Sequence, residues 1–160
     1  MPVSSNVRPH KTPLRLAVSE NTQPMTTQFE ARCTCGSFEF KSAGAPIFQL
    51  TCHCQQCRSA SKSPFTNLAF FKVAETSVVG DTEVHEFVAD SGTKTLRETC
   101  MGCGEMVLDR SQAFPQIIGV VAERIAPPYA FQPRCHVWLE SKVVDPSIAE
   151  GVKAFQQGMQ

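Results

Sequence analysis

The sequence predicts one small, mostly β domain organised around clustered cysteines. Short runs of apolar or alternating residues are separated by turn residues along most of the chain, which is typical of a sheet or a barrel-like sandwich. Helical periodicity is sparse. Seven of the eight cysteines gather in three tight clusters. A chain of 160 residues is long enough for one domain with its own hydrophobic core.

The expected strands are short and β-rich, and several alternate between apolar and polar residues. Residues 38–41 (FEFK) alternate cleanly, and 116–121 (QIIGVV) form a continuous apolar run. Turn residues such as Gly80-Asp81 and Pro127-Pro128 separate the runs. The expected strands cover residues 38–41, 46–50, 67–73, 76–79, 83–88, 94–98, 105–108, 116–121 and 136–139.

Two segments favour helix. Residues 55–61 predict one short helical turn. Residues 146–157 place Ile148, Val152 and Phe155 at helical spacing behind a proline, which predicts a short C-terminal helix.

Residues 1–26 differ from the rest of the chain because they are rich in Ser, Pro, Thr and Asn. We expect a disordered N-terminal tail, followed by one domain over residues 27–160. A weak organellar transit peptide, or a natural start of translation at Met25, would also suit this composition.

Charge and hydropathy exclude several classes of protein. Fifteen basic residues balance fifteen acidic ones, so no basic surface is expected to bind nucleic acid. No apolar run is long enough to cross a bilayer, so no membrane partner is expected. The N-terminus has no apolar secretory segment. Reduced thiols in the cytoplasm are therefore favoured over a secreted disulfide scaffold, although eight cysteines would permit one.

The first and third clusters are Cys33-Thr-Cys35-Gly and Cys100-Met-Gly-Cys103-Gly. Each places a glycine directly after its second cysteine, where a chain turning around a metal benefits from a residue that tolerates positive φ. Together the two pairs supply four thiolates, which form a closed, structural zinc site. Four unpaired buried cysteines are the alternative.

The second cluster is Cys52-His53-Cys54-Gln-Gln-Cys57. Three thiolates within six residues can hold one zinc and leave its fourth position open, the pattern of a reactive site. His53 or Cys135 could close that position. The ring of His53 is expected to point away, since both its neighbours are ligands, and Cys135 is expected to be an ordinary buried thiol.

The order CxCG, CHCxxC, CxxCG resembles the glutathione-dependent formaldehyde-activating enzyme (GFA) family, also called the CENP-V/GFA domain. The resemblance runs from about residue 28 to residue 144 and includes Arg58, Phe87, Ser91-Gly92 and His136. It implies an Mss4-like fold of short antiparallel strands around two zinc ions. One zinc would lie on Cys33, Cys35, Cys100 and Cys103, and the other on Cys52, Cys54 and Cys57.

The resemblance also implies a carbon–sulfur lyase activity, in which glutathione and formaldehyde form S-(hydroxymethyl)glutathione. A zinc-bound thiol would add to a small aldehyde, or the reverse. Arg58 could pair with a substrate carboxylate, or be a surface arginine. His136 could donate a proton to the developing alkoxide, or be a packed strand histidine. The sequence differs from the family pattern at 119–125 and after Lys142, so the identity of the thiol stays open. A non-enzymatic zinc module that binds a protein is the rival function, and a redox sensor that uses Cys52, Cys54 and Cys57 is a third, less favoured one.

Overall fold

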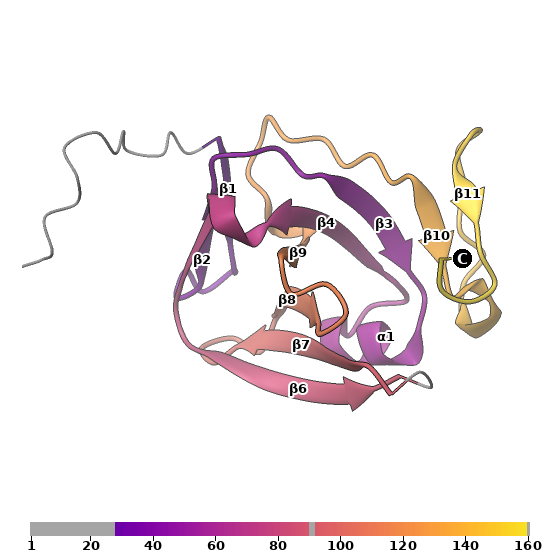
Figure 1. The fold of residues 1–160 in the computed structure, drawn as a ribbon, viewed down its shortest axis with the longest axis horizontal. Coiled ribbons are helices and arrows are strands. Elements are labelled where there is room, and N and C mark those ends of the chain that lie inside the picture. Colours follow the sequence, from indigo (N-terminus) through magenta and orange to yellow (C-terminus); the bar gives the residue numbers. More distant parts are fainter. Residues whose placement is uncertain (1–27, 90–91, 160) are drawn as a thin grey trace, which may run out of the picture.

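The computed structural model describes residues 28–89 and 92–159, and it is mainly β (Figure 1). The elements are β1 (Phe29–Arg32), β2 (Glu39–Ser42), β3 (Phe48–Cys52), α1 (Gln55–Ser61), β4 (Thr66–Lys72), η1 (Val73–Glu75), β5 (Thr76–Val79), β6 (Thr82–Val88), β7 (Lys94–Cys100), β8 (Met106–Ser111), β9 (Ile117–Val121), η2 (Ala122–Arg124), β10 (Cys135–Val137), η3 (Leu139–Ser141) and β11 (Lys153–Ala154). The prediction of a mainly β domain is confirmed.

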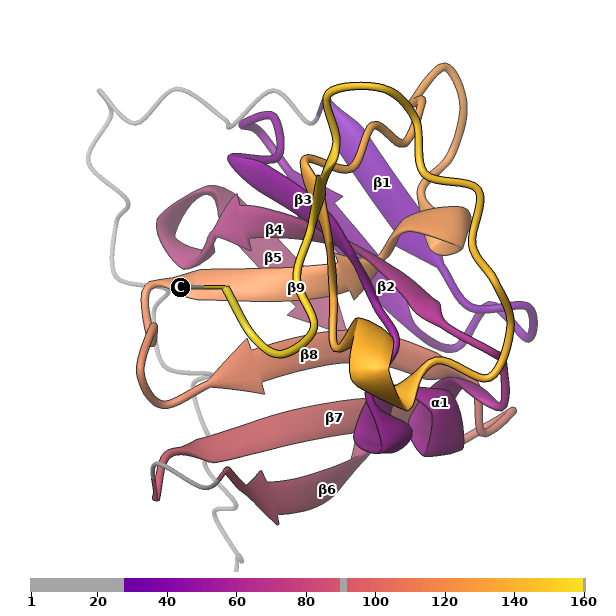
Figure 2. The same cartoon turned by 90° about the vertical axis from the view of Figure 1, so that its right-hand side faces the viewer.

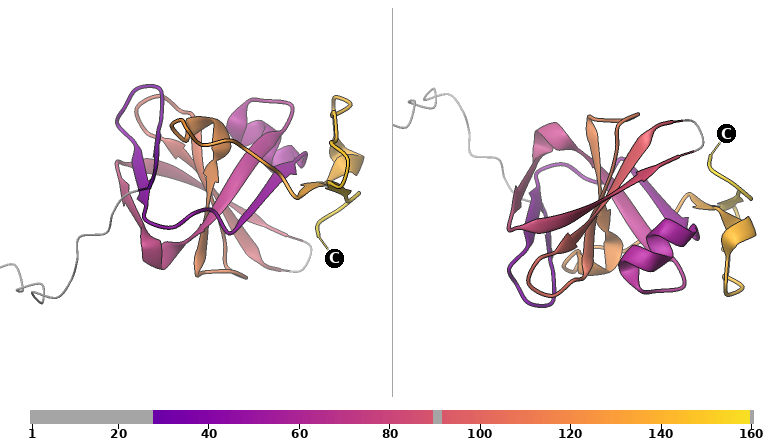
Figure 3. Two further views of the ribbon diagram at one scale, coloured as in Figure 1. Left: turned by 90° about the horizontal axis from the view of Figure 1, so that it is seen from above. Right: turned by 90° about the horizontal axis from the view of Figure 1, so that it is seen from below.

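Two sheets make up the fold. The larger has the order β11-β10-β3-β4-β9-β8-β7-β6, and Figure 2 shows it running from β3 down to β6. The smaller has the order β1-β2-β5. Most pairs are antiparallel, as expected, but β10 lies parallel to both β3 and β11. In Figure 3 the C-terminal segment lies at the opposite side of the domain from the β1–β2 hairpin.

The main hydrophobic core lies between the two sheets. Alternation in β2 buries Phe40 while Glu39 and Lys41 stay partly exposed. The Phe71 ring of β4 packs against Phe40 and Phe29, with centroids 5.1 and 5.9 Å apart. Aromatic pairs at these distances add to the free energy gained by burying their surface. This core fixes the position of the loop between β1 and β2, which carries the first pair of cysteines.

The expected short helix over residues 55–61 is confirmed as α1. The expected C-terminal helix over 146–157 is wrong. Gly151 has φ +81°, which a helix does not accept, and the backbone after it pairs with β10 instead. Lys153 N donates to Arg134 O at 3.0 Å, and Phe155 N donates to His136 O at 2.9 Å. The open edge of β10 therefore outweighs the helical spacing of the side chains.

The expected N-terminal tail lies outside the described residues. Within the described ranges, no helix has the length and apolar character needed to span a membrane.

Candidate metal centres

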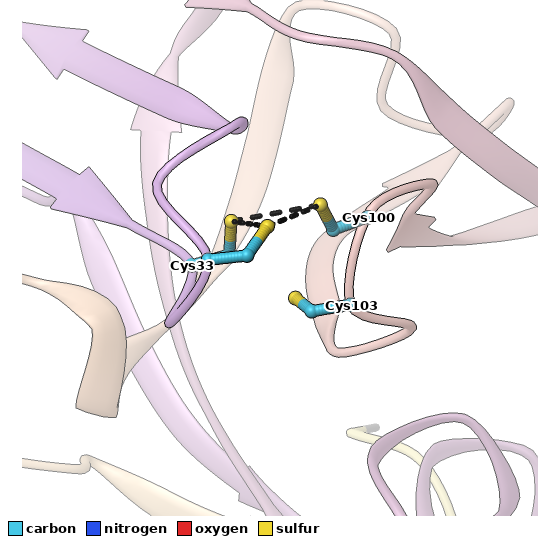
Figure 4. Close-up of side chains that lie close together, drawn as sticks. Cys33, Cys100 and Cys103 are labelled. Atoms are coloured by element: carbon cyan, nitrogen blue, oxygen red, sulfur yellow. Dashed lines mark hydrogen bonds between the residues drawn. The ribbon is translucent and has the colours of Figure 1, made fainter.

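The first and third cysteine clusters meet at one point. Cys33 and Cys35 lie in the turn after β1, while Cys100 ends β7 and Cys103 follows in the next turn. All four sulfurs lie within 4.8 Å of one another. Cys33 Sγ is 3.4 Å from Cys35 Sγ and 3.5 Å from Cys100 Sγ, and Figure 4 shows the labelled side chains pointing toward a common centre. This donor set fits one tetrahedral, thiolate-bound metal ion.

The surrounding backbone supports deprotonated sulfur. Phe38 N donates to Cys33 Sγ and Gly102 N donates to Cys100 Sγ, both at 3.3 Å. The Ser37 hydroxyl lies 3.2 Å from Cys100 Sγ. This hydroxyl, with backbone N–H groups of the 100–103 turn, lowers the pKa of Cys100 to about 6. A sulfur that is already anionic near neutral pH is suited to metal binding.

The two glycines that follow the cysteine pairs have the conformation predicted from the sequence. Gly36 has φ +78° and Gly104 has φ +74°, and each turns the chain back after its second cysteine. The sulfurs accept hydrogen bonds from other backbone N–H groups, among them those of Phe38 and Gly102.

A polar network outside the sulfurs joins the two cysteine turns. Glu105 accepts from Thr34 N at 2.8 Å, and Arg124 lies 3.4 Å from Glu105 in an ion pair. Arg124 also donates to Thr34 Oγ1 at 3.1 Å. Contacts of this kind orient metal-binding loops before the metal arrives.

The second cluster brings three buried sulfurs together at the end of β3. Cys54 is the N-cap of α1, and its sulfur accepts from Cys57 N at 3.3 Å. The helix thereby turns Cys57 back toward Cys52 and Cys54. All three sulfurs lie within 4.8 Å of one another, with Cys52 Sγ and Cys54 Sγ 3.3 Å apart.

Hydrogen bonds link the three sulfurs, and a cation could take the place of the shared protons. The Cys52 and Cys57 thiols donate toward Cys54 and lower its pKa to about 2. The hydrogen bonds of Cys52 to Cys54 and Cys57, together with burial, raise the pKa of Cys52. A divalent ion at the centre would take the place of these protons, so the donor set fits a metal.

No fourth histidine, cysteine or carboxylate in the described ranges joins this group at such distances. Cys135 is paired with Leu50 across β10 and β3, and it is buried in the apolar cluster beside the site. The His53 ring turns to His136, with Nε2 3.0 Å from Nδ1 of His136 and the two rings stacked. Both residues that could close the site are therefore placed elsewhere.

A pocket of about 660 Å³ reaches the second cluster at Cys54. Its wall is assembled from α1, β6, β7 and the C-terminal segment. The residues that line it include Gln55, Gln56, Phe87, Thr95, Arg97, Trp138, Ser141 and Gln157. Sequence reasoning missed Arg97 and Trp138. The sequence did contain one signal for Arg97, since this charged residue lies within the strand that leads into the third cysteine cluster.

The two residues expected to act in catalysis lie around the cluster loop rather than on this pocket wall. Arg58 Nε donates to the carbonyl of His53 at 3.3 Å. His136 is 6% exposed and holds the ring of His53. Burial lowers the pKa of His136. Burial also lowers the pKa of His53, and the neighbouring His136 lowers it further. Both contacts fix the conformation of the segment between Cys52 and Cys54.

The fold and these sites define a small β domain with one four-cysteine and one three-cysteine group, both able to hold metal ions. The sequence matches the family described as glutathione-dependent formaldehyde-activating enzyme over residues 28–141, and the chain belongs to that family. A crystal structure of a Rhodobacter sphaeroides protein is similar at 18% identity and a TM-score of 0.48, covering 63% of this chain and 90% of that one. No protein of curated function matches the chain.

Proposed function

We propose that both cysteine groups bind zinc and that the chain is a carbon–sulfur lyase-type enzyme acting on a thiol and a small aldehyde. Glutathione and formaldehyde are the substrates that the family description suggests. One observation carries the proposal. Three buried sulfurs are gathered for one metal, the described residues offer no fourth protein ligand, and Cys54 borders a pocket.

The four-cysteine group has a structural role in this proposal. It ties the β1–β2 turn to the turn after β7. Cys35 and Cys100, which meet in this group, are 65 residues apart in the sequence. Part of the folding free energy is then metal-binding free energy.

The three-cysteine group supplies the chemistry. Cys52, Cys54 and Cys57 would hold a zinc ion there, which would supply a position for binding and orienting a deprotonated thiol. The aldehyde would be held in the pocket that Cys54 borders, next to the bound thiol. The thiol would lose its proton to solvent on binding, and its sulfur would form a bond to the carbonyl carbon while the carbonyl π electrons move to oxygen. That oxygen would take up a proton from solvent to give the hemithioacetal.

His136 and Arg58 are proposed to support this reaction through the cluster loop. Arg58 holds the His53 carbonyl and His136 holds the His53 ring, so both keep Cys52 and Cys54 in place. Direct proton transfer from His136, or carboxylate binding by Arg58, stays a prediction. We also propose that the protein acts in the reducing cytoplasm, where free thiolates persist.

The test compares metal content and activity in three proteins. The wild type is expected to hold two zinc ions per chain, and Cys54→Ser one, with the fold retained. Cys135→Ala is the matched control, since it removes a buried cysteine outside the group and should keep both ions. Catalysed exchange of glutathione with formaldehyde, followed by NMR, should disappear in Cys54→Ser alone.

Two results would overturn the proposal. Loss of one zinc in Cys135→Ala would show that Cys135 closes the site, and the protein would then be a zinc-binding module. An exchange rate in the wild type no higher than the uncatalysed rate would remove the enzymatic function even if two zinc ions are bound.

A further inference from the structure

A buried arginine lies between an acidic side chain and the three-cysteine group. Arg97 belongs to β7 and its side chain is 10% exposed. Its Nε lies 3.1 Å from Oδ2 of Asp109, the residue opposite it on β8, in an ion pair that is not aligned as a hydrogen bond. Buried guanidinium groups are normally fully paired, because an unpaired buried donor costs free energy.

Two donor atoms of Arg97, including the Nε of this ion pair, form no hydrogen bond. Nε and Nη1 are buried and have no hydrogen-bond partner. The fold accepts this cost although β7 could carry an apolar residue here. An isolated structural ion pair with Asp109 does not describe this side chain, because Arg97 also forms a side-chain hydrogen bond with Cys57.

Arg97 also faces the sulfur cluster. It lines the same pocket as Cys54, and its strand β7 packs against α1. The positive charge of Arg97 acts on both Cys54 and Cys57. The guanidinium is therefore placed between one carboxylate and at least two sulfurs.

The charge balance of the site shows what this position can do. Three thiolates outweigh one divalent ion by one negative charge, and a fourth, incoming thiolate raises the excess to two. Such an excess is costly in a buried site unless a cation lies nearby. A neutral ligand at the same position adds no charge and does not need the cation.

We propose that Arg97 is a positioning residue that makes the open position of the three-cysteine metal site selective for anionic ligands. This inference rests on the proposed function and deepens it, since it requires a metal with a free position. Arg97 acts through its charge on the metal and its sulfurs, and it does not recognise any particular group of the thiol.

The experiment uses the cobalt-substituted full chain, because the visible spectrum of cobalt reports a new ligand directly. The probes are azide and 2-mercaptoethanol, which bind as anions, 3-mercaptopropionate, which adds a carboxylate, and imidazole, which is neutral. The variants are Arg97→Gln, Arg97→Lys as the charge-preserving control, and Asp109→Asn. Metal content of two ions per chain confirms that each variant is folded.

Arg97→Gln is expected to lower the affinity for azide and for both thiols about tenfold or more, while the affinity for imidazole changes less than about twofold. Arg97→Lys should stay within about threefold of the wild type for every probe. Asp109→Asn removes a competing negative charge, so azide and thiols should bind several-fold more tightly relative to imidazole. This opposite change keeps the test decisive if Arg97→Gln does not fold.

Three outcomes would overturn the inference. They are equal losses for imidazole and azide in Arg97→Gln, a loss confined to 3-mercaptopropionate, or no change in the ratio of anion to imidazole affinity in Asp109→Asn. Failure of the proposed function gives a different pattern. Azide would then still bind to the wild type, and Arg97→Gln would still lower its affinity. Neither thiol would change the spectrum of the wild type. A wild-type site that takes up no probe at all would overturn both.

Discussion

Gly102 is the residue whose replacement tests the four-cysteine site most sharply. It lies between Cys100 and Cys103, and a Cβ added there would be 2.6 Å from Ser37 Oγ and 2.9 Å from Cys35 Sγ. Both distances are shorter than real Cβ contacts, so one of the two atoms must move. A metal fixes the sulfur, so the Ser37 hydroxyl is displaced from Cys35 and Cys100, to which it lies at 2.8 and 3.2 Å.

The expected cost has two parts. Overpacking a tight site costs about 1–3 kcal/mol, and loss of the Ser37 hydrogen bonds costs about 1 kcal/mol more. Since about 1.4 kcal/mol is a factor of ten, Gly102→Ala should weaken metal binding at this site by roughly two orders of magnitude. The φ angle of Gly102 is not in the left-handed region, so the backbone itself accepts alanine.

The assay is competition for zinc with a chromophoric chelator in a Cys54→Ser background, where only the four-cysteine group is expected to bind. Gly36→Ala is the matched control, because a Cβ there meets no atom within 4 Å while φ is +78°. Its cost of about 1–2 kcal/mol is conformational. Ser37→Ala combined with Gly102→Ala should recover part of the lost affinity. Affinity within threefold of the parent for Gly102→Ala, or a larger effect of Gly36→Ala, would refute the steric argument.

Three further predictions follow from single side chains. Phe71 is fully buried, so Phe71→Ala should lower the free energy of unfolding, measured in urea, by about 3–5 kcal/mol. Phe114 is 54% exposed, so Phe114→Ala should change the same free energy by no more than about 0.5 kcal/mol. Similar effects of the two substitutions would contradict the assignment of the core. Tyr129 is the single tyrosine of the chain, and burial raises its pKa to about 12, so absorbance at 295 nm should titrate well above pH 10 in the folded protein and near 10 in urea. The neutral phenol then stabilises the fold fully below pH 10, and this contribution is lost as pH rises toward 12; a folded-state midpoint at 10 would refute it. Trp138, the single tryptophan, borders the Cys54 pocket, so its fluorescence should change when a thiol binds, and an unchanged emission during binding detected by cobalt absorption would place the thiol elsewhere.

The two cysteine groups could be predicted from the sequence because their geometry is largely local. Cys52, Cys54 and Cys57 reach one point through a strand end and a single helical turn, and the sequence spacing alone determines that. Pairing of Cys33-Cys35 with Cys100-Cys103 is not local, but four thiolates form the closed donor set that the chemistry of zinc prefers. The short strands could also be predicted from the sequence, because alternation such as that of β2 reflects the burial of one face of the strand.

The C-terminal segment and the pocket could not be predicted, for one shared physical reason. The helical spacing of residues 146–157 says nothing about the unpaired edge of β10, which lies nearby only in the folded chain and takes up the backbone of β11. The wall beside Cys54 likewise draws Arg97 from β7 and Trp138 from the segment after β10. Sequence reasoning therefore chose Arg58, the basic residue next to the cysteines along the chain, whereas the fold brings Arg97 to the pocket beside the three-cysteine group. Nearness in sequence selects the cysteines that gather into one group, while the sheet order selects the charged side chains that lie beside them.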